Sequence, residues 1–296
     1  MYLLTYNYDG ASSIGFLNKN ENGVIPADVV FNKLNKSVPI DMIDLIETLN
    51  ILSVENLKEA VEICDKESIV LDKISIIAPI PYPKRNVICL GKNYLDHINE
   101  VKSLKNVNAD VPTKPIYFSK IASPAIGQND LIDPHYVKEL DYEVELAIII
   151  GKKCKEVKKE NAENYIFGYT IANDISARDI QTGHIQWFKG KSFDTFCPLG
   201  PYIILKDDVE FPPALQIKSY VNGEIRQNSN TNKLIFDIPT IIEDLSSGTT
   251  LYPGDIILTG TPAGVGAGFN PPNYLKSGDK IECYIEKIGT LTNTIK

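Results

Sequence analysis

The sequence predicts a β-rich α+β protein, with a small N-terminal unit followed by a larger domain made mainly of strands. The chain has 296 residues, which is long for one domain and sufficient for two. Most apolar runs after residue 86 are short, β-branched and closed by turn residues, as is typical of strands. The proline-marked stretch Pro81-Tyr82-Pro83 separates these runs from an earlier part with helical patterns, and so indicates a boundary.

Residues 1–80 are predicted to form the small α+β unit. Met1–Tyr8 and Ser13–Asn18 have the pattern of paired short strands, and Ile74–Ile80 that of a further strand. Asp41–Leu52 and Ser53–Cys64 have helical patterns, and Ser53 is a suitable N-cap for the second helix. No cluster of reactive side chains is found in this part, so an accessory or packing role is expected.

Residues 81–296 are predicted to form the larger, strand-rich domain. Asn222-Gly223 between two apolar runs indicates a hairpin turn. Many strands with few helices predict packed sheets or a barrel-like roll. The strand candidates are Val87–Leu90, Pro115–Lys120, Tyr142–Ile150, Phe167–Ala172, Tyr202–Ile204, Gln216–Val221, Asp255–Thr259 and Lys280–Ile285.

The composition excludes several classes of protein. A net charge of −8 with dispersed acidic residues argues against nucleic-acid binding, which needs a basic face. No run of eighteen apolar residues occurs, and the N-terminus lacks the basic and apolar regions of a secretory signal. Five widely spaced cysteines without a Cys-x-x-Cys pair favour reduced thiols over disulfides or zinc. We therefore expect a cytoplasmic protein with no nucleic-acid or membrane partner.

The most informative stretch is the acidic strand that runs from Leu140 to Gly151. Side chains alternate along a strand, so Glu143 and Glu145 are expected on the same face. The residues that follow are apolar on both faces, which is typical of a covered strand. Two carboxylates about 4–7 Å apart repel by roughly 2–4 kcal/mol at an effective dielectric constant near 20. A proton, a cationic side chain or a metal ion must offset that repulsion.

Asp174 stands where another apolar strand ends, and it could share a cavity with the two glutamates. Glu143, Glu145 and Asp174 would form an all-oxygen site, which suits Mg²⁺, Mn²⁺ or Ca²⁺ better than Zn²⁺. Arg178 and Lys191 are candidate cations beside it. On spacing alone, the alternative stays open that Glu143 and Glu145 pair with lysines on an exposed strand.

A second candidate lies in the segment that follows the strand ending at Leu90. Asn93 could N-cap a short helix, and His97 and Glu100 would then share one face at i,i+3 spacing. Such a pair can act as a general base with its orienting carboxylate. A solvated helix face is the alternative. Lys191 lies in a turn-rich loop and could hold a substrate carboxylate, or it could be an ordinary surface lysine.

A glycine-rich run, Gly264-Val265-Gly266-Ala267-Gly268, only superficially matches a dinucleotide-binding loop. The position of the third motif glycine is Phe269, and Pro271-Pro272 follows where a helix should begin. A Rossmann site is therefore rejected.

Together, these segments resemble the fumarylacetoacetate hydrolase (FAH) family across nearly all of residues 81–296. Each motif is weak alone, and their ordered occurrence carries the resemblance. They are Gly91-Lys92-Asn93-Tyr94, Asp141-Tyr142-Glu143-Val144-Glu145-Leu146, Asn173-Asp174-Ile175-Ser176-Ala177-Arg178-Asp179, Gln186-Trp187 with Gly190–Phe196, Pro253-Gly254-Asp255, Thr259–Gly266 and Ile288-Gly289-Thr290-Leu291.

The resemblance implies an FAH-type β-roll that holds Mg²⁺ or Mn²⁺, or Ca²⁺ in a crystal, on Glu143, Glu145 and Asp174. It implies a mobile lid from Asn93 to about Val111 and a homodimer. The N-terminal unit resembles the small extra domain of longer bacterial-type members. The lid carries His97 and Glu100, and the expected substrate contacts are Arg178, Gln181, Lys191 and Thr261. Lys189 replaces an arginine found in many relatives, which affects only the expected choice of substrate.

The implied activity is divalent-metal-dependent hydrolysis or lysis of a C–C bond in a 2-oxo acid, as in acylpyruvate hydrolysis or oxaloacetate decarboxylation. If only a proton moves, the result is keto–enol tautomerisation or isomerisation. The alternatives are an isomerase/decarboxylase of unsaturated dicarboxylic 2-oxo acids in aromatic catabolism, a ureidoglycolate lyase, and a metal-stabilised binding protein without catalytic activity.

Overall fold

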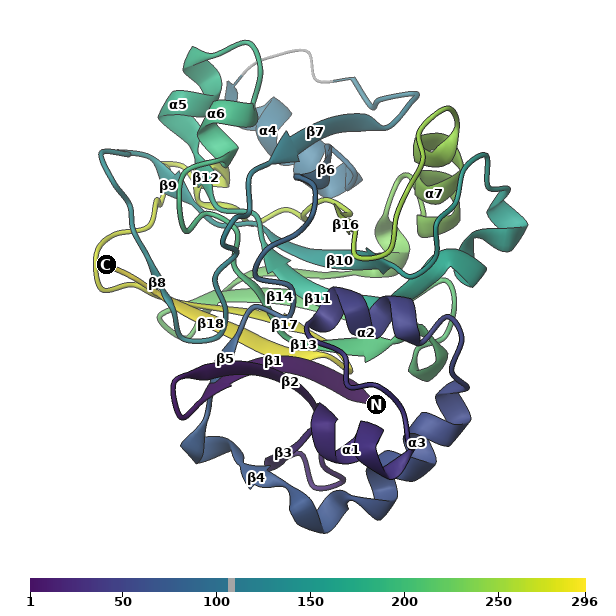
Figure 1. Ribbon diagram of the computed structural model, residues 1–296. Coiled ribbons are helices and arrows are strands. Elements are labelled where there is room, and N and C mark those ends of the chain that lie inside the picture. Colours follow the sequence, from purple (N-terminus) through teal and green to yellow (C-terminus); the bar gives the residue numbers. More distant parts are fainter. Residues whose placement is uncertain (106–109) are drawn as a thin grey trace.

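The computed structural model describes residues 1–105 and 110–296 of the chain. Two large β-sheets form most of it, with short helices gathered mainly at two opposite ends (Figure 1). The predicted β-rich α+β class is confirmed. In this part of the chain, no helix is both long and apolar enough to cross a membrane.

The larger sheet has 11 strands and extends from the N-terminal unit into the catalytic domain. The tenth and eleventh strands of the chain lie side by side near its centre and run antiparallel. In spatial order the strands are β4 (Ile69–Val70), β3 (Gly23–Pro26), β2 (Ala11–Leu17), β1 (Tyr2–Tyr8), β13 (Leu199–Leu205), β11 (Ile166–Asn173), β10 (Val144–Ile150), β16 (Ile256–Leu258), β6 (Val87–Gly91) and β7 (Ile116–Lys120), with β5 (Ser75–Ile77) pairing with β1.

The second sheet has five strands and packs against one face of the first. Its order is β15 (Glu224–Asn230), β14 (Gln216–Val221), β17 (Lys280–Ile285), β18 (Gly289–Ile295) and β8 (Leu131–Ile132). The predicted hairpin is confirmed, because Asn222 and Gly223 join β14 to β15 with φ of 52° and 79°. A two-stranded ladder pairs β9 (Leu140–Asp141) with β12 (Ser176–Ala177).

Short helices lie around the two sheets. Helices α1 and α3 lie at the N-terminal end, near the bottom of Figure 1, α2 lies near mid-height beside the central strands, and α4 to α6 lie at the opposite end, at the top. The α-helices are α1 (Ala27–Lys33), α2 (Met42–Thr48), α3 (Val54–Ile63), α4 (Leu95–Lys105), α5 (Arg178–Gly183), α6 (Phe188–Lys191) and α7 (Ile238–Ser246). The 3₁₀ helices are η1 (Asp65–Glu67), η2 (Leu71–Lys73), η3 (Lys159–Tyr165), η4 (Lys206–Asp208), η5 (Thr231–Lys233) and η6 (Gly266–Gly268).

Strand β10 is buried on both faces, and this explains its continuous apolar sequence. Ile148 packs into the core between the two sheets, whereas Ile149 packs into a second core beneath the N-terminal helices. The expected strand Tyr142–Ile150 is shorter than predicted, because β10 begins at Val144 and Glu143 precedes it. Two apolar cores thus hold the strand that presents the acidic residues.

In the N-terminal unit, the predicted cap at Ser53 is confirmed, since its hydroxyl accepts a hydrogen bond from the Asn56 amide at 3.4 Å. The sequence missed helix α1, as well as α7 and β18 in the larger domain. The division at residue 80 stays a prediction. Strand β1 pairs with β13, with Leu3 opposite Ile203, so the sheet continues across that division.

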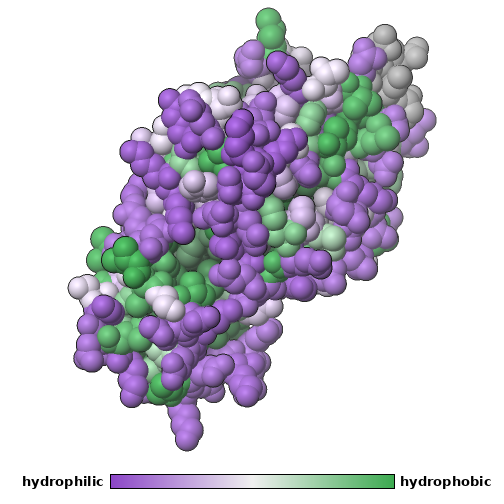
Figure 2. All heavy atoms as spheres, turned by 90° about the vertical axis from the view of Figure 1, so that its right-hand side faces the viewer, coloured by the Kyte–Doolittle hydropathy of each residue, from purple (hydrophilic) through white to green (hydrophobic). Residues whose placement is uncertain are grey.

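The molecular surface turned toward the viewer in Figure 2 is mostly hydrophilic, with apolar side chains in small separate groups. Some exposed large apolar residues belong to the N-terminal unit, such as Ile40 and Ile51, which are 86% and 91% exposed.

Candidate active site

A pocket of about 330 Å³ lies at the end of the molecule where α4, α5 and α6 gather. Trp187 forms part of its wall and meets Phe118 edge-on, with the ring centroids 5.3 Å apart. Most of the predicted site residues line this pocket, although they come from distant parts of the sequence. They are His97, Glu143, Glu145, Arg178, Gln181, Lys191 and Thr261. Asp174 and Glu100 lie directly behind them, each bonded to a lining residue.

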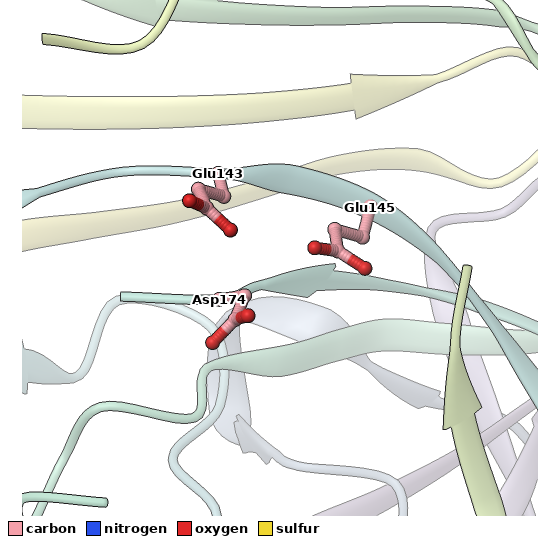
Figure 3. A group of neighbouring side chains, drawn as sticks. All are labelled: Glu143, Glu145 and Asp174. Atoms are coloured by element: carbon pink, nitrogen blue, oxygen red, sulfur yellow. The ribbon is translucent and has the colours of Figure 1, made fainter. Parts of the chain in front are cut away.

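Three carboxylates converge at the floor of this pocket. Glu143 and Glu145 flank the start of β10, and Asp174 follows β11 (Figure 3). One oxygen from each lies within 4.8 Å of the others, and all three side chains are buried. The Asp174 amide donates to the Glu143 carbonyl at 2.8 Å, which fixes the two chain segments side by side. The interpretation of Glu143 and Glu145 as exposed strand residues is therefore wrong.

Buried cations surround the acidic centre. The Lys191 ammonium donates to Glu143 Oε2 and to Asp174 Oδ2, each at 2.7 Å. Arg178 Nη2 lies 2.6 Å from Glu143 Oε1, and Lys120 Nζ lies 2.5 Å from Asp174 Oδ1. Lys191 is 2% exposed, so its interpretation as a surface lysine is wrong.

The two glutamates respond in opposite ways to this environment. Burial alone would raise the pKa of Glu143, but the charges of Lys191 and Arg178 hold it well below its usual range. Burial raises the pKa of Glu145 well above its usual value, and repulsion from Asp174 and Glu143 adds to the effect. Glu145 is therefore the carboxylate that most needs an additional positive charge.

The donor set fits a hard divalent ion. Three carboxylates meet without a histidine or thiol in their group, and oxygen ligands of this kind suit Mg²⁺ or Mn²⁺. Apart from its ion pair with Lys120, the buried Asp174 Oδ1 atom accepts no hydrogen bond from the described residues. The negative charge that raises the pKa of Glu145 is what such a cation would neutralise. The residues present are thus compatible with one metal ion.

His97 and Glu100 form the expected pair on α4. Their Nδ1 and Oε2 atoms are 3.2 Å apart, and His97 faces the pocket that contains the acidic centre. The alternative of a solvated helix face is wrong, because the two side chains are only 12% and 14% exposed. An ionised carboxylate can only accept, so its partner Nδ1 carries the proton and leaves Nε2 free to act as a base.

The segment that leads into α4 is held by hydrogen bonds that the sequence did not predict. The expected N-cap role of Asn93 is wrong, because its side chain bonds to the backbone of distant segments instead. Asn93 Nδ2 donates to the Thr259 and Phe236 carbonyls at 2.8 and 3.0 Å, and its Oδ1 accepts from the Phe236 amide at 2.7 Å. The expected lid extends into residues 106–109, which lie outside the described residues.

The side chains expected to contact substrate already make hydrogen bonds within the protein. Arg178 Nη1 donates to Gln181 Oε1 at 3.0 Å, so these two side chains face the pocket as a unit. Thr261 donates to the Val144 carbonyl at 2.9 Å and accepts from Gln227 Nε2 at 2.7 Å. Its hydroxyl hydrogen is already used, and the substrate contact expected of Thr261 stays a prediction.

Three polar residues of the site were missed by the sequence reasoning. Lys120 ends a predicted strand, and its isolated charge gave no signal that it would be fully buried. Gln227 joins Val144 to the loop after β16 through its side-chain amide. Asp141 pairs with Arg178, with 2.8 Å between Oδ2 and Nε. Its position two residues before Glu143 was a usable signal, since i and i+2 residues share a face.

The fold and pocket define a class of protein: an enzyme with a buried carboxylate centre that could hold a divalent ion, and with a histidine–glutamate pair beside it. The chain belongs to the fumarylacetoacetate hydrolase family. The family described as "Fumarylacetoacetate (FAA) hydrolase C-terminal" matches residues 86–296. The expected family and the expectation of an enzyme are confirmed.

Relatives of known name extend this assignment. Oxaloacetate tautomerase YisK of Bacillus subtilis (strain 168) is 49% identical over 227 residues, covering 76% of this chain and 74% of that protein. The structure of fumarylacetoacetate hydrolase from psychrophilic Exiguobacterium antarcticum matches with a TM-score of 0.84 and 37% identity, over 100% of this chain and 99% of that one. The 5-carboxymethyl-2-hydroxymuconate delta-isomerase of Mycobacterium smegmatis matches with a TM-score of 0.75 and 32% identity, over 100% and 99%.

Proposed function

We propose that this protein is a divalent-metal-dependent enzyme of 2-oxo acids whose main reaction is the keto–enol tautomerisation of oxaloacetate. The observation that carries the proposal is the His97–Glu100 pair, which faces the same pocket as the buried carboxylate centre. The relative named oxaloacetate tautomerase supports the choice of substrate. A dedicated base beside an electrophilic centre is what proton transfer next to a carbonyl requires.

The chain's own residues fit the charge of the substrate. A bound divalent ion would supply a Lewis acid that stabilises an enolate. Four carboxylates, including Asp141, face three buried cations, so one negative charge remains on the protein when all are ionised. A divalent ion would reverse that sign and favour an anionic ligand. His97 Nε2 would take the proton from C3 of the substrate and deliver it to the enolate oxygen on C2, and Lys191 would balance the charge that develops on that oxygen in between.

Hydrolytic cleavage of a C–C bond is the second candidate. The same pair could deprotonate water instead of substrate, and the match to a solved fumarylacetoacetate hydrolase over the whole chain favours this interpretation. Oxaloacetate decarboxylation would use the enolate stabilisation without attacking water. Isomerisation of an unsaturated dicarboxylic 2-oxo acid, as named for the Mycobacterium smegmatis protein, would again need only proton transfer.

Further proposals concern the state of the protein. We propose Mg²⁺ or Mn²⁺ as the ion, on Glu143, Glu145 and Asp174, and a homodimer as the assembly. A cytoplasmic location is supported by the cysteines, all five of which are free thiols and buried.

The deciding experiment compares substrates under one condition. The purified protein with Mg²⁺ is assayed for loss of the enol absorbance of oxaloacetate, for pyruvate release from oxaloacetate, and for cleavage of acylpyruvates and ureidoglycolate. Fast enol loss without pyruvate release, abolished by EDTA and restored by Mg²⁺, is the expected result. Faster acylpyruvate cleavage would establish the second candidate, and no metal-dependent turnover of any substrate would refute both.

A further inference from the structure

The glycine-rich loop after β16 receives the carboxylate of Glu100. The Gly264 amide donates to Glu100 Oε1 at 2.8 Å, while the other carboxylate oxygen lies 3.2 Å from His97 Nδ1. Glu100 therefore bridges the loop and the imidazole. Helix α4 packs against η6 of this loop, so the bridge is part of a wider contact.

Gly268 lies directly against the Glu100 side chain. A Cβ atom at Gly268 would lie 2.1 Å from Glu100 Oε1 and 2.2 Å from its Cδ, which is far below any real contact. The φ of Gly268 is not in the left-handed region, so a side chain would cause no backbone strain there. The clash would be with the end of a flexible side chain, and it would move the Glu100 carboxylate rather than the fold.

The loop is also fixed to the acidic centre. Asp141 accepts from the Gly266 amide at 2.6 Å and from the Ala267 amide at 3.0 Å. The same carboxylate accepts from Arg178 Nε at 2.8 Å, and Arg178 reaches Glu143. A short series of direct contacts, from the loop through Asp141 and Arg178 to Glu143, thus fixes the position of the loop relative to the acidic centre.

We propose that Gly268 is a positioning residue for the His97–Glu100 pair. The missing side chain lets Glu100 reach the Gly264 amide, and this bond holds the carboxylate where it orients the imidazole over the acidic centre. Alanine at this position would displace Glu100, and His97 would lose its orienting partner. The effect on catalysis rests on the function proposed above, whereas the effect on α4 does not.

The test uses Gly268→Ala, with Gly183→Ala as the matched control. Gly183 ends α5 and has no left-handed φ, and a Cβ atom added to it would meet no other atom within 4 Å. Hydrogen exchange of the metal-free proteins is followed in Leu95–Glu100 and in β10. Exchange in Leu95–Glu100 should be roughly tenfold faster in Gly268→Ala only, because α4 loses a charge-assisted hydrogen bond to the loop. Exchange in β10 should be unchanged.

The second arm is a double-mutant cycle on oxaloacetate tautomerisation. Gly268→Ala should lower kcat by about 10- to 100-fold, less than the loss of the base itself, with Mg²⁺ affinity unchanged. In a Glu100→Ala background the clash is gone, so Gly268→Ala should have no further effect. An equal loss in both backgrounds, or unchanged exchange in α4, would overturn the proposal. If the wild type does not act on oxaloacetate, the exchange arm still decides the role of Gly268.

Discussion

Replacing Glu145 by glutamine tests the electrostatics of the acidic centre most directly. The change removes one charge at constant shape, and the amide oxygen can still accept from the Gly260 amide, which lies 2.6 Å from Glu145 Oε2. Burial and the charges of Asp174 and Glu143 raise the pKa of Glu145 in the metal-free fold. Between its unfolded pKa, about 4.3, and its raised folded pKa, the folded state binds more protons than the unfolded state. The free energy of unfolding therefore falls as the pH rises through this window.

The size of the effect follows from that window. Each pH unit between the unfolded and the folded pKa costs the wild type about 1.36 kcal/mol, so the cost grows as the pH rises through the window. Glutamine avoids this cost, so Glu145→Gln should be more stable than the wild type without metal, and more so at pH 7 than at pH 5.

The assay is urea unfolding at pH 5, 6 and 7, in EDTA and in Mg²⁺. Mg²⁺ at about 100 times its Kd should stabilise the wild type by about 2.7 kcal/mol. It should stabilise the variant much less, because a ligand is lost. Glu59→Gln, at an exposed position on α3, is the matched control. It should change neither the stability in EDTA nor the stabilisation by Mg²⁺. A variant no more stable than the wild type in EDTA at pH 7, or a gain that does not shrink toward pH 5, would refute the reasoning.

Three further predictions concern catalysis and the lid. His97→Ala or Glu100→Ala should reduce both acylpyruvate hydrolysis and oxaloacetate tautomerisation by about 10²–10⁴-fold. The Mg²⁺ affinity, measured by calorimetry, should not change. A fully active His97 variant would exclude the role of His97 as the base. Lys191→Met should reduce every reaction of the site and destabilise the fold by about 3–5 kcal/mol in urea, since two buried carboxylates each lose one of their two cationic partners. A loss below about 1 kcal/mol would contradict this. Residues 93–111 should exchange amide hydrogens faster than β10 without ligand, and equal protection would argue against a lid.

The acidic centre could be predicted from the sequence because it depends on a local rule. Glu143 and Glu145 are two residues apart, and strand alternation alone places them on one face. The Ser53 cap and the Asn222-Gly223 turn were predictable for the same reason, since each depends on a few neighbouring residues. Asp174 needed the end of a second strand, and only the family resemblance made its place beside the glutamates a firm expectation.

The residues that the sequence missed depend on contacts between distant segments. Lys120 meets Asp174 only because β7 and the end of β11 converge on one side of the pocket. Asn93 has the composition of a helix cap, yet the Phe236 and Thr259 backbone groups satisfy its side chain. The close approach of Glu100 to Gly268 likewise cannot be predicted from the sequence, because it depends on where α4 lies. Propensity and periodicity carry no information about such distances.

The fluorescence of Trp187 can report on events in this pocket. It is the only tryptophan in the sequence, and its ring lies so close to Gly91 that a Cβ there would be 2.3 Å from Cζ3. Gly91 ends the strand that leads into α4, and the indole also meets the Phe118 ring in the pocket wall. Its emission therefore comes from one place, where substrate entry and the predicted movement of the lid would both alter the surroundings of the indole. Binding constants and the rate of that movement can be read from unlabelled protein in a stopped-flow fluorimeter.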